Sequence, residues 1–100
     1  ALREVSDSLV SVRKRREFRQ QQELLVNALA DASQVATMRY EGGVSSYLEV
    51  LDTERQYFDA EVQLVQAKRD ESLSVIQLFK ALGGGWQADA TATAAASTKQ

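Results

Sequence analysis

Residues 39–86 read RYEGGVSSYLEVLDTERQYFDAEVQLVQAKRDESLSVIQLFKALGGGW, and the glycines in this stretch decide the fold. Gly42 and Gly43 separate two long stretches that contain neither glycine nor proline. Glycine is costly inside a helix and readily adopts the positive φ of a helix terminus. Ser46 is a candidate N-cap, and Glu49 three residues later completes a capping-box pattern. The stretch therefore predicts two helices joined by a tight turn.

The first helix is expected from about Val5 to about Tyr40, because apolar side chains recur there at steps of three and four residues. Its apolar stripe consists of Leu2, Val5, Leu9 and Val12, and further on of Leu25, Ala28, Ala32 and Val35. Between Arg13 and Glu23, in the run RKRREFRQQQE, Phe18 is the only apolar residue. Packing along this polar run must therefore be looser, polar or made against another segment.

The second helix is expected from about Ser46 to about Leu82, where the glycines at 83–85 should end it. Its stripe has the more regular three-and-four spacing of a coiled coil. The stripe consists of Val44, Leu48, Leu51, Arg55, Phe58, Val62, Val65, Arg69, Ser72, Ile76 and Phe79. Apolar residues off this stripe, which require further neighbours, are Val50, Leu64, Val75 and Leu78. The fold class predicted is all-α, a long antiparallel helical hairpin that resembles a coiled coil.

The two expected helices carry opposite net charge, and the residues after them have a low-complexity composition. Residues 1–40 hold seven Lys or Arg against five Asp or Glu, whereas residues 41–82 hold four against eight. The arms are thus biased to +2 and −4, which favours their pairing side by side, although exposed pairs contribute little. Residues 87–100 are rich in Ala, Thr and Ser and lack a large apolar anchor, so we expect a disordered tail after a hairpin formed by residues 1–86.

Composition argues against several kinds of function. The 100 residues include no His, Cys or Pro, so the side chains that most often hold metals or act as thiol nucleophiles are missing. The remaining acids and bases lie on expected helix faces without a cleft, and we expect neither an enzyme nor a cofactor or metal site. No stretch approaches the roughly 18–20 uninterrupted apolar residues of a membrane-spanning helix, and the first residues do not resemble a signal peptide.

A series of short anchors carries a family resemblance. In order, they are Arg39 and Tyr40, Gly43 and Val44, the segment Tyr47 to Asp52, Arg55, and the segment Ala81 to Trp86. Their order and spacing resemble the C-terminal helical hairpin of the outer membrane efflux proteins, the TolC-like channels of tripartite pumps. With the opening ALREV, the resemblance covers nearly all of the chain before Gln87. The ALGGGW ending is similar to the lipoprotein-type, NodT-like branch.

The resemblance implies a gate at the start of the second helix, where Leu48, Asp52 and Arg55 share one face because they are four and three residues apart. In TolC-like channels this part lies at the narrow periplasmic end, where three protomers meet around an axis. Leu48 then matches a hydrophobic ring, Asp52 an acidic ring, and Arg55 an arginine that ties the closed state together. Glu49 matches a second gate aspartate of some members. From the residues alone, a capped turn with a surface ion pair explains the same pattern.

The resemblance also implies partners. The tip residues Gly43, Val44, Ser45 and Ser46 match the part of the hairpin that meets the periplasmic adaptor (membrane fusion) protein, although a tight turn alone accounts for their composition. The full-length protein would be a homotrimer in the outer membrane, with this segment in the periplasm, and would work with an inner membrane pump in passive export. Any contact with the membrane would come from parts absent here.

Two alternatives use the same sequence. A generic helical-hairpin interaction module shares the fold and lacks the channel. The basic run from Arg13 to Arg19 superficially resembles the basic region of a DNA-binding leucine zipper. A zipper needs Leu at sustained heptad intervals, whereas steps of seven from Leu25 lead to Ala32 and Arg39 and then to the turn. We therefore expect no nucleic acid partner.

Overall fold

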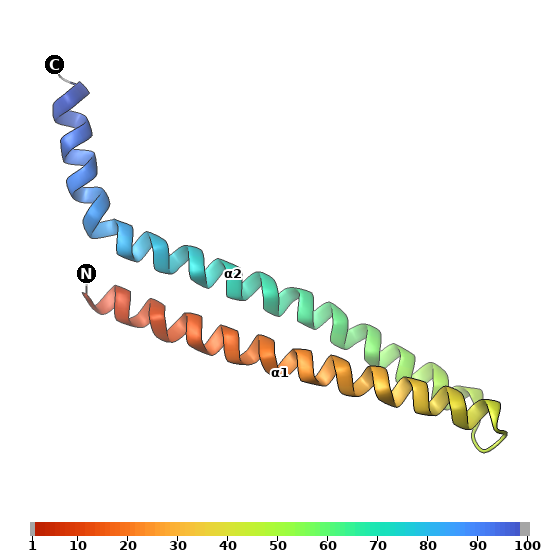
Figure 1. Ribbon diagram of the computed structural model, residues 1–100. Helices are drawn as coiled ribbons and strands as arrows, with labels where there is room; N and C mark the ends of the chain where they lie inside the picture. Colours follow the sequence, from red (N-terminus) through yellow and green to blue (C-terminus); the bar gives the residue numbers. More distant parts are fainter. Residues whose placement is uncertain (1, 99–100) are drawn as a thin grey trace. The chain divides into compact units, whose positions relative to one another are not determined.

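Two long helices make up the chain in the computed structural model, which describes the backbone of residues 2–98 and the side chains of residues 2–83. Helix α1 spans Leu2–Glu41 and helix α2 spans Tyr47–Thr98 (Figure 1). The described residues contain no strand. The predicted all-α hairpin is confirmed, and both helices flank the turn within the expected limits.

The C-terminal end of α2 differs from the prediction, because the helix continues past the glycines at 83–85 to Thr98. Each helical glycine costs about 1 kcal/mol relative to alanine, but glycine does not exclude the helical conformation as proline does. The chain contains no proline, and the alanine-rich sequence that follows favours a helix. The predicted helix end at Leu82 was therefore wrong. The side chains of 84–100 lie outside the described residues, and the disordered tail over 87–100 stays a prediction.

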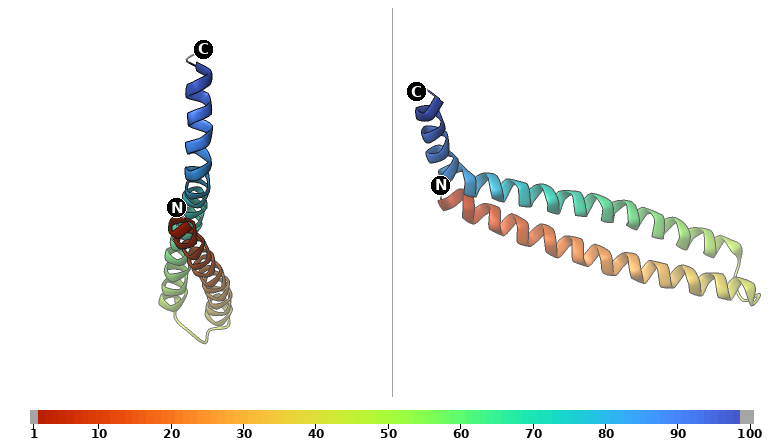
Figure 2. Two further views of the ribbon diagram at one scale, coloured as in Figure 1. Left: turned by 90° about the vertical axis from the view of Figure 1, so that its left-hand side faces the viewer. Right: turned by 45° about the horizontal axis from the view of Figure 1, so that its top comes forward.

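The helices form two compact units, which are described separately. Unit 1 comprises Ala1–Arg16 and Asp70–Gln100, and unit 2 comprises Glu17–Arg69 with the turn. Within each unit, a part of α1 lies beside an antiparallel part of α2 (Figures 1 and 2). We call the surface along which the two helices face each other the seam.

The seam of unit 2 follows a heptad pattern on α2 that alternates large and small side chains. The buried or half-buried α2 residues at this spacing are Val50, Thr53, Tyr57, Ala60, Leu64 and Ala67. Those of α1 in the same unit are Arg19, Gln22, Val26, Leu29, Ser33 and Ala36. Ala36, Ala60 and Ala67 are almost completely buried. Small residues at alternate positions let two helix backbones approach closely, while the larger neighbours fill the edges of the seam.

The seam of unit 1 continues the same spacing on α2. Its buried or half-buried α2 residues are Glu71, Ser74, Leu78 and Ala81, and those of α1 are Val5, Ser8 and Val12. Ser74 takes the small position and is 4% exposed. The seam is therefore lined with alanine, serine and a few larger side chains, and it buries little apolar area per turn.

Most of the large apolar side chains lie outside the seam, which corrects the predicted stripes. On α1, Val12 is buried and Val5 half-buried, but the other six stripe residues are exposed. On α2, the whole predicted stripe is exposed, with Leu48 at 75%. The four residues expected off the stripe are buried or half-buried instead. We name the exposed α2 residues Leu48, Leu51, Phe58, Val62 and Val65 in unit 2, and Ile76 and Phe79 in unit 1, the outer stripe.

Simple helical geometry explains this reversal. Seam and outer stripe on α2 have the same three-and-four spacing, and each outer position precedes a seam position by two residues. Two residues turn a helix by about 200°, so the two faces lie about 160° apart. Either face satisfies the periodicity, and the structure pairs α1 with the one that carries small residues. In the part of the chain that was searched, no helix is long and apolar enough to cross a membrane.

Candidate functional site

The turn between the helices is a Schellman motif built on Gly43. This glycine has φ +74°, a conformation in which a side chain would be strained. The N–H of Val44 donates to the Arg39 carbonyl at 2.8 Å, and the N–H of Gly43 donates to the Tyr40 carbonyl at 3.0 Å. These two bonds satisfy carbonyls that the end of α1 would leave unpaired. The positive φ expected at the glycine pair is confirmed at Gly43.

The start of α2 is capped differently from the prediction. The Glu49 N–H donates to the Ser46 backbone carbonyl at 3.2 Å, and among the described residues the Ser46 hydroxyl accepts no capping bond from a backbone N–H. The Glu49 carboxylate instead lies 3.9 Å from the Arg39 guanidinium of α1. Beside this pair, the rings of Tyr40 and Tyr47 lie 5.1 Å apart at a tilt of 57°. An ion pair and an aromatic pair thus join the helices at the tip.

The tip presents a small surface with one apolar residue. Val44 is 72% exposed, and Gly43 and Ser46 are exposed beside it. Ser45 is half-buried, and its hydroxyl oxygen has neither solvent access nor a hydrogen-bond partner. The four predicted tip residues therefore lie together in one short loop, in which Gly43, Val44 and Ser46 are exposed and the Ser45 hydroxyl is not.

Leu48, Asp52 and Arg55, for which a gate was predicted, lie on an exposed face of unit 2. The Arg55 guanidinium is 3.4 Å from the Asp52 carboxylate, and the Gln56 amide donates to the other Asp52 oxygen at 2.8 Å. The Leu48 side chain, one turn earlier on α2, is 75% exposed. The structure thus brings Leu48, Asp52 and Arg55 together. Glu49 is separate, because its carboxylate is turned toward α1.

Neighbouring side chains on α2 hold the Asp52 carboxylate in one orientation. Asp52 accepts from two side chains of its own helix, which orients its carboxylate without removing it from water. An exposed pair of this kind contributes only about 0–1 kcal/mol to folding. The pair of Asp52 and Arg55 therefore contributes little to the free energy of unfolding of the hairpin. The exposed Leu48 side chain beside it contributes little as well, because it buries little apolar area. The arrangement is suited to contact with something outside this chain.

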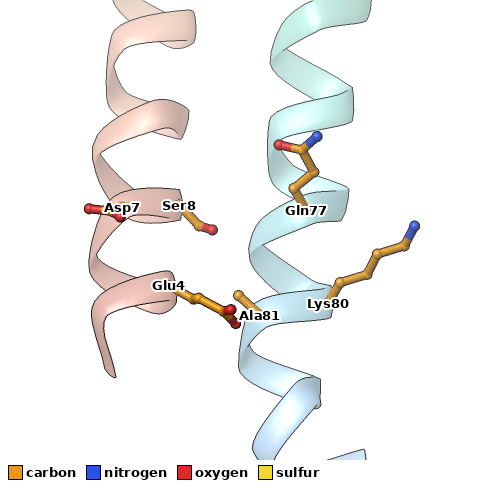
Figure 3. A pocket seen from close by; sticks show the side chains of 6 residues that line it. All are labelled: Glu4, Asp7, Ser8, Gln77, Lys80 and Ala81. Atoms are coloured by element: carbon orange, nitrogen blue, oxygen red, sulfur yellow. The ribbon is translucent and has the colours of Figure 1, made fainter. Parts of the chain in front are cut away.

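A hollow between the helices of unit 1 is lined by charged and polar side chains. Its volume is about 390 Å³, and the residues that line it are Glu4, Asp7, Ser8, Gln77, Lys80 and Ala81 (Figure 3). Figure 3 shows the Asp7 and Lys80 side chains pointing away from each other, so their charges do not converge on one point. No group of three or more His, Cys, Asp or Glu side chains in the searched part of the chain could hold a metal ion.

Sequence reasoning missed two contributors to this region. Arg39 was an anchor of the resemblance, but its pairing with Glu49 across the turn was not foreseen. Gln56 lies four residues after Asp52, and that spacing could have suggested the amide bond. Only the contact between Arg39 and Glu49 depends on the rotation of α2 about its axis, which was assigned to the wrong face.

Comparison with known proteins agrees with this geometry. A family model described as outer membrane efflux protein matches residues 1–84. The solvent efflux pump outer membrane protein SrpC of Pseudomonas putida is 42% identical over 87 residues, which are 86% of this chain and 18% of that protein. The toluene efflux pump outer membrane protein TtgF of Pseudomonas putida is 41% identical over 86 residues, with the same shares.

A third relative extends the similarity to another species. The outer membrane protein OprJ of Pseudomonas aeruginosa is 35% identical over 86 residues, again 86% of this chain and 18% of the relative. The chain thus spans less than a fifth of the length of the relatives it matches. The family match and these identities together cover the helices, the turn and the exposed face of Leu48, and the chain belongs to the outer membrane efflux protein family.

Proposed function

We propose that this hairpin forms part of the wall and the gate of a periplasmic tunnel in an outer membrane efflux channel. The observation that carries the proposal is the exposed face of α2 on which a bare leucine, Leu48, lies beside the ordered pair of Asp52 and Arg55. In a single hairpin this combination is an exposed leucine beside a surface ion pair, which contributes little to folding. Repeated around an axis, it forms a narrow ring.

The outer stripe supports assembly with further helices. It lies nearly opposite the seam on α2, so α2 has one contact face toward α1 and a second face for another neighbour. A helix with two such faces fits a curved row of helices, as in the wall of a tube. We propose a homotrimer in the full-length protein, located in the outer membrane with this segment in the periplasm.

The gate acts by aperture and charge. Copies of Leu48 at a narrow point exclude water, as hydrophobic constrictions do in channels. Copies of Asp52 repel one another and attract cations, while Arg55 offsets the repulsion. Opening separates the helices, widens both rings and allows solutes to pass passively. The tip residues 43–46 would meet a periplasmic adaptor protein that connects the channel to an inner membrane pump.

Conductance in a planar bilayer tests the gate. In the full-length protein, we expect Leu48→Ala combined with Asp52→Ala to raise the resting conductance, because the substitutions widen both rings. Asp52→Ala alone should weaken cation binding to the closed pore. Glu61→Ala is the matched control, since Glu61 is an exposed carboxylate on α2 away from the proposed rings.

The opposite result would favour another role. If the double variant conducts like the parent while Glu61→Ala has an equal or larger effect, Leu48 and Asp52 do not line the constriction. The hairpin would then be an interaction module whose turn carries a surface ion pair.

A further inference from the structure

The seam of unit 1 contains a polar section that the channel function does not explain. Its residues are Arg15 and Arg16 on α1, and Asp70, Glu71 and Ser74 on α2. Glu71 occupies the heptad position that Leu78 occupies one heptad later. A carboxylate therefore replaces an apolar side chain at a place where the helices face each other.

Ion pairs bridge the helices in this section. The Arg16 Nε atom is 3.6 Å from the Glu71 carboxylate, and an Arg15 guanidinium nitrogen is 4.0 Å from the Asp70 carboxylate. The Glu71 side chain is 19% exposed, whereas the Arg16 side chain is 55% exposed. The arginines thus reach in from solvent, where salt screens their attraction to the carboxylates.

The packing of the section is loose. Ser74 is buried, but its hydroxyl donates to the Glu71 carbonyl of its own helix at 2.6 Å. A cavity of about 150 Å³ is lined by Ser11, Arg15, Asp70, Leu73, Ser74 and Gln77. Such a polar cavity has room for water molecules. Few apolar contacts therefore oppose hydration of the section.

We propose that this polar section is a built-in joint at which α1 and α2 separate more readily than they do along the seam of unit 2. Local opening costs least where few apolar side chains are buried and where polar groups can accept water. Among the described residues, five of the six buried apolar side chains lie in unit 2, and only Val12 lies in unit 1. The ion pairs of the joint hold it closed in a way that depends on salt.

Hydrogen exchange of the full-length protein, followed by mass spectrometry, tests the joint. After correction for intrinsic rates, we expect residues 9–16 and 70–77 to exchange at least about tenfold faster than residues 26–36 and 53–67. Raising the salt from about 0.05 M to about 1 M, where the screening length falls to about 3 Å, should speed exchange at the joint further. Exchange along the seam of unit 2 should change little.

Substitutions distinguish the effect of the missing apolar contacts on hydrogen exchange from the effect of the ion pairs. Glu71→Leu should slow exchange at the joint by about tenfold or more, because it buries a leucine at a seam position. Asp7→Leu is the matched control, since it exchanges the same kinds of side chain at an exposed position of unit 1. Arg15→Gln combined with Arg16→Gln should speed exchange and abolish its salt dependence.

Two results would overturn the proposal. The first is exchange at 9–16 and 70–77 as slow as along the seam of unit 2 in the unmodified protein. The second is an effect of Glu71→Leu no larger than that of Asp7→Leu. Neither result depends on whether Leu48 and Asp52 form a gate.

Discussion

Replacing Ala60 with leucine should destabilise the hairpin strongly. Ala60 is 4% exposed at a small seam position, and its carbonyl accepts a bond of 3.1 Å from the buried Gln22 amide. Overpacking a close-packed site costs about 1–3 kcal/mol. Displacing Gln22 loses a further contribution of about 0.5–1.5 kcal/mol. We expect a total loss of about 1.5–4.5 kcal/mol in the free energy of unfolding.

Such a loss is large for this fold. Small single cores rarely provide more than about 3–5 kcal/mol, so Ala60→Leu should leave the isolated chain largely unfolded or lower its melting temperature by at least about 6 °C. A thermal scan followed by far-ultraviolet circular dichroism, which reports on helix content, measures both the loss of helix and the melting temperature. Gln66→Leu is the control, because it adds leucine at an exposed position of the same helix and unit.

The control decides the interpretation. We expect Gln66→Leu to change the free energy of unfolding by no more than about 0.5 kcal/mol, as is usual for surface positions. If Ala60→Leu melts like the parent, the small-residue face of α2 is not where α1 packs. The same conclusion would follow if Gln66→Leu were the more destabilising change.

Two further predictions concern the turn and the outer stripe. Gly43→Ala should lower the free energy of unfolding by about 1–2 kcal/mol, because φ +74° strains a residue with a Cβ atom, and a denaturant titration that shows no loss would contradict the Schellman geometry. The isolated chain should self-associate through its outer stripe, since Leu48, Phe58 and Val65 are each more than 60% exposed. Sedimentation should show weaker association for Phe58→Ser combined with Val65→Ser, and a parent that stays monomeric at high concentration would refute this.

The sequence was sufficient to predict the two helices and the turn, because those features depend on local chemistry. Gly43 can adopt the positive φ that ends α1, and the absence of proline allows both helices to run without a break. The end of α2 was missed, because three glycines lower helix stability without excluding the helix. Weak local preferences do not settle such a boundary.

The choice of seam could not be made from periodicity. Both faces of α2 repeat at three and four residues, and hydrophobicity favoured the face with Leu48, Phe58 and Val62. In the structure, the backbones of α1 and α2 approach closely along the face of α2 that carries the small residues Ala60 and Ala67. The larger residues of α2 were predicted to pack against α1, but they are exposed. The prediction was wrong because the sequence of one chain does not show how many neighbours each helix has. Leu48, Asp52 and Arg55 were still grouped on one exposed face, since that grouping requires only the helical repeat.

The division of side chains between the two faces of α2 has a consequence for stability and assembly. A seam of alanine and serine buries little apolar area, so the hairpin alone gains little free energy from it, at about 25 cal/mol per Å². The outer stripe carries leucine, valine and phenylalanine, whose burial would contribute about 1.5–3 kcal/mol each when another helix covers them. Substitutions at Ala60 therefore report on the hairpin, and substitutions at Phe58 or Val65 report on assembly. Leu48 belongs to the second class, so a change of conductance in Leu48→Ala can be attributed to the aperture once both the helicity of the hairpin and the assembly of the full-length protein are unchanged.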